Sequence, residues 1–414
     1  MRSHSEILAR SKCQVVKKVG TSSSYKRIIR TAAAFLALDQ ITPVAAKILL
    51  HNKVRFSLTL TGIAIAFFLA AAQFGLLVGW INTNTAIIRH AGVDVWVMAP
   101  QTPAFDYGTA IPRNRLYQVR SMPGVAWAEG LFMAWNIWQR GDGRRVNVEL
   151  VGLDESSQGG PWRMREGSVD VVHLPHTVIV DELYMQALGV RRVGDSFAMI
   201  GQQAIVGGIS SGIRTFTASP FIFTSIKSAI RYDKRYLEDE ITYVMARCVP
   251  GFTPEYVRDT IRARVPQVEV LTTVQFATRT VQYWMLETGL GLTVVITAML
   301  GLGVGVMIIS QTLFAITQDH LPNYATLLAL GFSHRRLAMI VLMQSLALGG
   351  CGIAGGSVLF IAACYATAKT PIPLETTPLV FTSLIFVSLL SSGLASFVSV
   401  RSLFNLDPVS VFHV

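Results

Sequence analysis

A Gly-x-Ser-x-Gly motif is the most distinctive catalytic pattern in the sequence. It covers residues 208–212 and would make Ser210 the nucleophile of a hydrolase. Such a serine sits on a sharp turn between a strand and a helix, but the residues that follow, IRTFTASPFIF, have little helical pattern. We therefore expect Ser210 to be structural, and a membrane-anchored outer enzyme that uses Ser210 stays an alternative hypothesis.

Two histidines form a second candidate site. His173 and His176 lie near Asp170 and Asp181, and these side chains are of the types that bind zinc. Pro175 separates the two histidines, so a loop is the better interpretation. The nucleotide-binding pattern GxxxxGK[ST] does not occur in the sequence, so we expect ATP to be bound by another chain. The sequence thus predicts no catalytic, cofactor-binding or metal site here.

Composition points instead to a membrane protein. Of the 414 residues, 51% are hydrophobic and 15% are charged, whereas soluble chains average about 25% charged residues. A membrane span needs about 20 apolar residues. Charge-free runs of that length predict four transmembrane helices, at 57–80, 289–316, 338–367 and 378–400. A fifth charge-free run, 196–213, is rich in Gly, Ser and Gln, and we expect it to form strands and turns.

The distribution of charge predicts the topology. Residues 1–55 carry 11 Lys and Arg against two acidic residues, a net charge of +9, whereas 81–286 carries 21 against 19. Because basic loops stay in the cytoplasm, we expect both termini inside and 81–286 outside. The other expected parts are a basic mobile tail (1–37), an amphipathic juxtamembrane helix (38–56), a cytoplasmic coupling segment (317–337), an outer turn (368–377) and a cytoplasmic tail (401–414).

The predicted spans contain no Asp, Glu, Lys, Arg or His. Transporters coupled to protons or ions usually need such groups within the membrane, so this argues against that class. The net charge of +11 comes mainly from residues 1–55, and the outer domain shows no basic face, so nucleic acid is not an expected partner. The expected partner of the four spans is the lipid membrane.

Aromatic and small residues mark the ends and faces of the spans. Trp80 closes the first span, and Tyr283 and Trp284 precede the second, so we predict three interfacial anchors. Two GxxxG pairs predict close packing between helices. Four spans are also too few to enclose a channel, so we expect a homodimer. The predicted packing residues are Gly301, Gly305, Gly352 and Gly356.

The outer domain reads as mixed α/β. The first part, 93–140, and the last part, 241–273, each look like a β-α-β unit, and the region between them is rich in strands. An Asp-Gly turn at 141–143 predicts a hairpin from 126 to 154. Cys248 is its only cysteine, so its core must form without an internal disulfide.

The segment between the second and third spans has a different character. Thr326, Leu327 and Leu330 form the face of a short apolar helix that Gly331 would end. Such a helix would project into the cytoplasm, where a soluble partner could bind it. The alternative is an ordinary loop. Before the first span, 38–56 predicts either an elbow helix that steers this span or a simple anchor.

One span, a large outer domain and three further spans resemble the FtsX/MacB-like ABC transporter permeases. The local sequence is similar to the DevC-type permeases, named for a heterocyst glycolipid exporter. The segments that carry this resemblance are AAKILLHNKVRFSLTLTGIAIAF (45–67), VQYWMLETGLG (281–291), SQTLFAITQDHLPNYATLLALGFS (310–333) and SLFNLDPVSVF (402–412).

The resemblance implies a membrane α-helical protein of the bacterial inner membrane, with four transmembrane helices and a large periplasmic α/β domain after the first. It implies a homodimer that works with a separate ABC ATPase, which would hold ATP and Mg, and with a periplasmic membrane-fusion adaptor and a TolC-like channel. ATP-driven motion would be relayed through the spans to export a lipid-like substrate. An FtsX-like signalling scaffold that activates periplasmic cell-wall hydrolases is the alternative.

The resemblance also places the ATPase contact in the coupling segment. Two features depart from the family pattern there: Pro322-Asn323 replaces a Lys-Glu pair, and Leu328 replaces a basic residue. Either the contact is less polar than in other members, or this chain is a divergent paralogue with its own ATPase. The implied coupling residues are Gln318, Asp319, His320, Tyr324, Thr326, Leu327, Leu330 and Gly331.

Overall fold

A computed structural model describes residues 53–215, 219–329, 332–371 and 373–404. The chain divides into two compact units. The first, here called the helical unit, contains the chain up to Leu69, Leu300–Val358 and the chain from Thr382 onward. The second, the outer unit, contains Ala70–Met299 and Leu359–Phe381. The predicted tail 1–37 and most of the predicted helix 38–56 lie outside the described residues.

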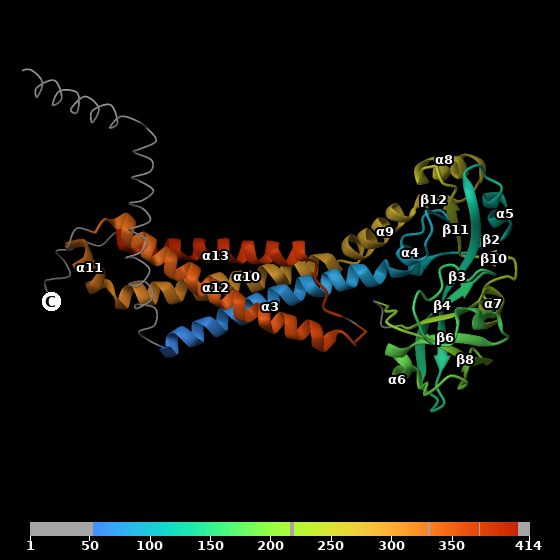
Figure 1. Cartoon of the computed structure of the whole chain (residues 1–414), viewed down its shortest axis with the longest axis horizontal. Coiled ribbons are helices and arrows are strands. Elements are labelled where there is room, and N and C mark those ends of the chain that lie inside the picture. The colour runs from blue at the N-terminus through green and yellow to red at the C-terminus, as the bar shows by residue number, and fades with distance from the viewer. Residues whose placement is uncertain (1–52, 216–218, 330–331, 372, 405–414) are drawn as a thin grey trace, which may run out of the picture. The chain divides into compact units, whose positions relative to one another are not determined.

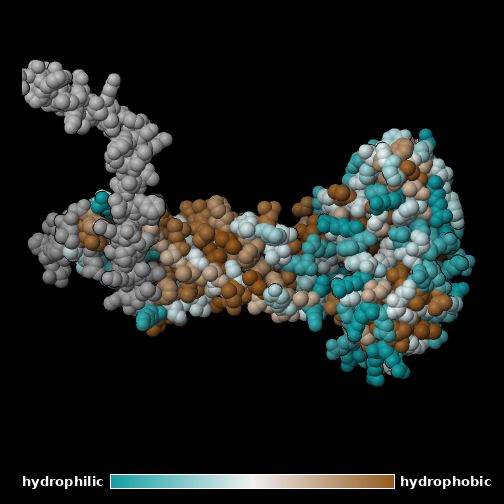
Figure 2. All heavy atoms as spheres, in the orientation of Figure 1, coloured by the Kyte–Doolittle hydropathy of each residue, from teal (hydrophilic) through white to brown (hydrophobic). Residues whose placement is uncertain are grey.

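Four long helices carry the apolar runs (Figure 1). Within the described residues, each is long and apolar enough to cross a membrane, and each overlaps one predicted span. Their exposed surface is largely hydrophobic in Figure 2, as expected for helices that face lipid. The helices are α3 (Lys53–Asn84), α10 (Leu290–Asp319), α12 (His334–Thr367) and α13 (Pro378–Phe404).

The helical unit packs around aliphatic side chains and a few hydroxyl groups. Ile63, Leu313 and Leu348 are among its buried residues. The hydroxyls of Thr59 on α3 and Thr312 on α10 lie 3.2 Å apart, within hydrogen-bond distance. In a membrane such contacts between helices supplement van der Waals packing, because lipid offers no polar partner.

One of the two predicted GxxxG pairs lies in a tight helix contact. A Cβ atom at Gly356 of α12 would lie 2.6 Å from the carbonyl oxygen of Ala64 on α3, and a Cβ at Gly352 would overlap Ile63. Only glycine permits this approach of the two backbones. The other pair is looser, because a Cβ at Gly305 would lie 3.3 Å from Ala66.

The outer unit is built on one large sheet with helices on both faces (Figure 1). The strands of this sheet are β1 (Val95–Met98), β3 (Val125–Gln139), β4 (Arg145–Leu153), β5 (Met164–Glu166), β6 (Thr177–Asp181), β7 (Ser196–Met199), β8 (Gln202–Ser210), β9 (Phe221–Ser225), β11 (Tyr243–Cys248) and β12 (Glu269–Thr272). The short strands β2 (Ile111–Pro112) and β10 (Glu240–Ile241) pair with each other in a separate two-stranded sheet. The short helices of the outer unit are α4 (Ala86–His90), η1 (Phe105–Tyr107), α5 (Asn114–Arg120), η2 (Val169–His173), η3 (Glu182–Tyr184), α6 (Met185–Leu188), α7 (Ile226–Tyr232), α8 (Pro254–Arg264), α9 (Thr273–Gln282) and the π-helical turn η4 (Tyr283–Glu287).

The strands follow the order β12-β1-β11-β3-β4-β9-β6-β8-β5. The first four are antiparallel neighbours and come from β1-α5-β3 and β11-α8-β12, which is the ferredoxin-like arrangement of two split β-α-β units. The two predicted β-α-β units correspond to these two parts of the sheet. The predicted hairpin is confirmed, since β3 and β4 pair from Leu131–Leu153 to Gln139–Arg145.

The strand-rich insert, which is the part of the chain between β3 and β11, extends the same sheet. β4 pairs in parallel with β9, and β6 pairs in parallel with β8. The charge-free run 196–213 forms β7 and β8, as the sequence predicts. Because β3 is long enough to pair with both β11 and β4, it joins the ferredoxin-like part to the insert.

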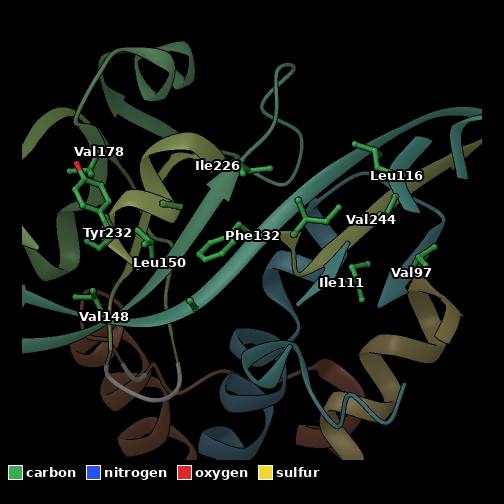
Figure 3. Close-up of a cluster of buried hydrophobic side chains, with 14 of the residues drawn as sticks. Val97, Ile111, Leu116, Phe132, Val148, Leu150, Val178, Ile226, Tyr232 and Val244 are labelled. Carbon is green, nitrogen blue, oxygen red and sulfur yellow. The ribbon is translucent and has the colours of Figure 1, made fainter. Parts of the chain in front are cut away.

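Both faces of the sheet are buried. One face, covered by α5, α6, α7 and α8, includes Phe132, Leu150 and Val244 (Figure 3). The opposite face, covered by α4, α9 and the two 3-10 turns η1 and η2, includes Trp96 and Met245. Burial on both sides explains why these strands read as continuous apolar runs rather than alternating ones.

Two of the helices that cover the second face, α4 and α9, also connect the sheet to the long helices. The chain leaves α3 through α4, and it enters α10 through α9 and η4. Ile88 of α4 and Phe276 of α9 are fully buried in one cluster with Trp96. Both connections are therefore packed on the same face of the sheet.

A pair of buried carboxyl groups lies beside this connection. Asp106 is 6% exposed and Glu149 is 1% exposed. The Asp106 side chain lies beside those of Trp284 and Glu149. Removal from water disfavours the charged carboxylate. Burial therefore raises the pKa of Asp106 from 3.8 to about 6.

We predict that Gly356→Ala destabilises the folded chain. The added methyl group would meet the Ala64 carbonyl oxygen, which belongs to the backbone and cannot rotate away, so α3 and α12 must separate. We expect a loss of about 1–3 kcal/mol, measured as a lower unfolding midpoint of the full chain in detergent.

Gly350→Ala is the matched control, since nothing lies within 4 Å of a Cβ atom at that position of the same helix. Its midpoint should equal that of the unchanged chain or exceed it. Equal midpoints for the Gly350 and Gly356 variants would contradict the tight contact.

We predict that Asp106→Asn removes a pH dependence from the outer unit. The pKa of Asp106 is higher in the folded chain, so the folded state keeps a proton that the unfolded state releases. Stability is then greatest below about pH 4 and falls as the pH rises through 6, and asparagine at position 106 should reduce this loss. Unfolding midpoints between pH 4 and pH 7 measure it, with the exposed Asp142→Asn as control. Parallel curves for both variants would refute the assignment.

Candidate functional site

The predicted coupling segment forms a short helix between α10 and α12. This helix, α11, spans Leu321–Ala329. His320 joins it to α10, because its amide donates to the Ile316 carbonyl while its own carbonyl accepts from the Tyr324 amide. Pro322 is in the first turn of α11, where a proline is tolerated because first-turn amides have no partner within the helix.

One face of α11 is held within the chain. Tyr324 is fully buried with Leu337 and Val341 of α12, and Leu327 packs against this cluster. The Tyr324 hydroxyl lies near the side chain of Gln344, and burial raises the pKa of this phenol to about 12, so it stays neutral. Tyr324 and Leu327 therefore fix α11 to α12.

The opposite side of the segment is open. Gln318, Asp319, Pro322 and Thr326 are exposed, and His320 is half-buried. Pro322 and Thr326 are four residues apart, so they share a face of α11, and the Thr326 hydroxyl donates to the Pro322 carbonyl at 3.0 Å. The exposed set Gln318, Asp319, Pro322 and Thr326 is called the coupling face below.

The end of the segment is closed by Phe332, whose amide donates to the Leu327 carbonyl at 3.0 Å. The guanidinium of Arg336 lies 5.8 Å from the centre of the Phe332 ring, which is cation–π distance. Leu330 and Gly331, which the resemblance also implies as coupling residues, lie outside the described residues.

The three predicted interfacial anchors lie close to one another. The rings of Trp80 and Trp284 are 6.3 Å apart and meet edge to face. Tyr107 brings its ring within 5.6 Å of Tyr283 and 6.0 Å of Trp284. The aromatic groups thus join α3, η1 and η4 within the outer unit, and their position at a membrane interface stays a prediction.

Ser210 is built into the sheet rather than onto a catalytic turn. It is the last residue of β8, is fully buried, and donates to the Asp181 carboxylate at 2.8 Å. The described residues that follow it, up to Thr215, form no helix. This geometry agrees with a structural role for the serine.

The histidine region shows no shared ligand geometry. His173 lies 2.9 Å from the Ser157 hydroxyl, while Asp181 accepts from Ser210 and from the amides of Gly212 and Ile213. Among the residues that the structure describes, no group of three or more His, Cys, Asp or Glu could hold a metal ion.

Sequence reasoning missed one link in the outer unit. The guanidinium of Arg214 donates to the carbonyls of Ala368 and Thr370, in the turn after α12. The partners are about 150 residues apart in sequence, and no local pattern marks them.

Comparison with known families supports both parts of the chain. Residues 56–264 match the MacB-like periplasmic core domain, which is half of the chain, and residues 294–408 match the FtsX-like permease C-terminal region. A comparison with curated proteins gives no match.

Among solved structures, the periplasmic region of MacB from Actinobacillus actinomycetemcomitans is similar. It shares 10% identity at a TM-score of 0.35, covering 46% of this chain and 94% of that one. The extracellular domain of the noncanonic ABC-type transporter YknZ from Gram-positive bacteria shares 7% identity at a TM-score of 0.33, covering 43% and 98%. On the family matches, this chain belongs to the FtsX/MacB-like family of ABC transporter permeases.

Proposed function

We propose that this chain is the membrane subunit of an export system whose energy comes from a separate ABC ATPase. The ATPase would bind the coupling face, and the long helices would relay its motion to the outer unit. The observation that carries the proposal is that α4 and α9, which continue α3 and α10, are packed on one face of the sheet. A displacement of either helix must therefore reach the sheet.

In this proposal both termini are cytoplasmic, the outer unit is periplasmic, and the protein is a homodimer in the bacterial inner membrane. A membrane-fusion adaptor and a TolC-like channel would carry the substrate onward. The predicted spans hold no ionisable side chain, which suits a relay of motion better than an ion pathway. The DevC-type resemblance makes a lipid-like or hydrophobic substrate the first candidate.

The structure changes which coupling residues should be tested. Leu327 packs within the chain, so an acidic substitution there would disturb α11 itself. Asp319 and Thr326 are exposed on the coupling face, so their substitution should alter the partner contact, and the melting midpoint reports whether the fold is kept. The contact implied at Leu327 is thus better sought on the coupling face.

We predict that Asp319→Arg combined with Thr326→Arg weakens ATPase binding by about tenfold or more, because two long, positively charged side chains would enter the contact. The full chain is purified with the ATPase that co-purifies from its native membrane, and both retention and ATP hydrolysis are measured. Lys227→Asp, an exposed charge change on α7, is the control.

The control should bind and stimulate the ATPase as the unchanged chain does. Undiminished binding by the double variant, with an unchanged melting midpoint, would exclude the coupling face as the contact. Purification of the unchanged chain without any ATPase, and without ATP hydrolysis, would refute the proposed function.

We further expect that deletion of the gene depletes a lipid or other hydrophobic compound from the outer membrane. Extracted outer-membrane lipids of the deleted and complemented strains are compared by mass spectrometry. An unchanged lipid profile together with a defect in cell-wall cleavage would favour the FtsX-like scaffold instead.

A further inference from the structure

A single arginine joins two distant parts of the outer unit. Arg214 follows β8, and its Nε donates to the Thr370 carbonyl at 3.2 Å while Nη2 donates to the Ala368 carbonyl at 2.5 Å. These carbonyls belong to the turn that follows the C-terminal end of α12. A helix leaves its last carbonyls unpaired and carries partial negative charge there, so a guanidinium satisfies both needs.

The backbone around Arg214 is fixed on the sheet side. The amide of Ile213 donates to the Asp181 carboxylate at 2.8 Å, and Asp181 is 1% exposed at the end of β6. On the other side, the Thr215 amide donates to the Tyr184 hydroxyl at 3.0 Å. Arg214 is therefore held between two buried anchors and moves with the insert.

The turn is fixed on the helix side. The Glu375 amide donates to the Gly75 carbonyl of α3 at 3.1 Å, and the Asn82 side chain donates to the Glu375 carboxylate at 2.7 Å. The Leu374 amide donates to the Thr367 hydroxyl at 3.1 Å, which holds the turn against the end of α12. Movement of these helix ends is thus communicated to the Arg214 partners.

The Arg214 link meets the sheet far from the chain connections in the strand order. The chain connections through α4 and α9 meet the sheet at β1 and β12, at one end of the strand order. Arg214 follows β8, which is near the other end. The insert is already attached through the pairing of β3 with β4 and through the stack of His90 of α4 on Trp162. Arg214 adds an attachment near the other end of the strand order. With Arg214, the sheet is supported near both ends.

We infer that Arg214 is a positioning residue that ties the insert to the turn between α12 and α13, so that movement of these helices reaches β6 and β8 directly. The inference rests on the proposed relay of ATPase-driven motion. The planar guanidinium donates from two nitrogens to two carbonyls at once, which lysine cannot do, so Arg214→Lys should restore the link only in part.

The first experiment tests the contact alone. Arg214→Cys and Thr370→Cys are introduced into the full chain after its four native cysteines have been changed to serine. A thiol cross-linker of about 8 Å is used on native membranes. The long arginine side chain bridges two backbone segments that lie too far apart for a direct disulfide between cysteines. We expect an intramolecular cross-link, and the exposed Arg231→Cys with Thr370→Cys should give none. No cross-link at position 214, or equal yields for both pairs, would overturn the contact.

The second experiment tests its role. Spin labels at the exposed positions Gln203 of β8 and Leu379 of α13 report their distance with and without ATP, in the complex with the ATPase. Arg214→Ala should reduce the ATP-dependent change about fivefold while ATP hydrolysis and the melting midpoint stay unchanged, with Arg214→Lys intermediate. Arg231→Ala should behave like the unchanged chain.

A full ATP-dependent change in Arg214→Ala would overturn the inference and leave the proposed function intact. Absence of both ATP hydrolysis and distance change in the chain with Arg214 would overturn the proposed function, and the relay role of Arg214 with it. A lowered melting midpoint in Arg214→Ala, with a normal distance change in Arg214→Lys, would assign the arginine to stability and not to the relay.

Discussion

The packing of α4 and α9 on one face of the sheet is the contact on which the outer unit depends. Trp96, Phe105, Tyr243 and Phe276 meet there with ring centres 5.3–6.5 Å apart. Large aromatic groups bury much apolar surface in defined geometries, so such a cluster is stiff. It joins the two chain connections to the central strands, and it is the main route by which force carried by α3 or α10 reaches the ferredoxin-like part.

The two units depend on different kinds of contact. In the helical unit, α3 and α12 approach through Gly352 and Gly356, which face Ile63, Ala64 and Phe67 of α3. Such contacts depend on van der Waals packing between closely spaced backbones. In the outer unit, by contrast, buried carboxylates such as Asp181 hold several donors at once, so its loops move with the sheet.

The sequence was informative wherever a local pattern decides the structure. Charge-free runs marked the long helices, and the Asp-Gly turn marked the β3–β4 hairpin, because both depend on neighbouring residues. The parallel pairing of β4 with β9, and the contact of Arg214 with Thr370, depend on residues far apart and have no local signal. Solvent exposure also could not be predicted from the sequence. Leu327 and Thr326 both fit a short apolar helix, but in the structure Leu327 packs against α12 whereas Thr326 is exposed.

The strand order also has a consequence for biosynthesis. Among the described strands, β1 pairs with β11 and β12, which begin at Tyr243 and Glu269, so β1 gains its partners only when nearly the whole outer unit has been synthesised. The β3–β4 hairpin and the pairs within the insert are available earlier. Contacts of long sequence separation form slowly. The insert should therefore fold first, and the ferredoxin-like part should close last, once β12 has been synthesised.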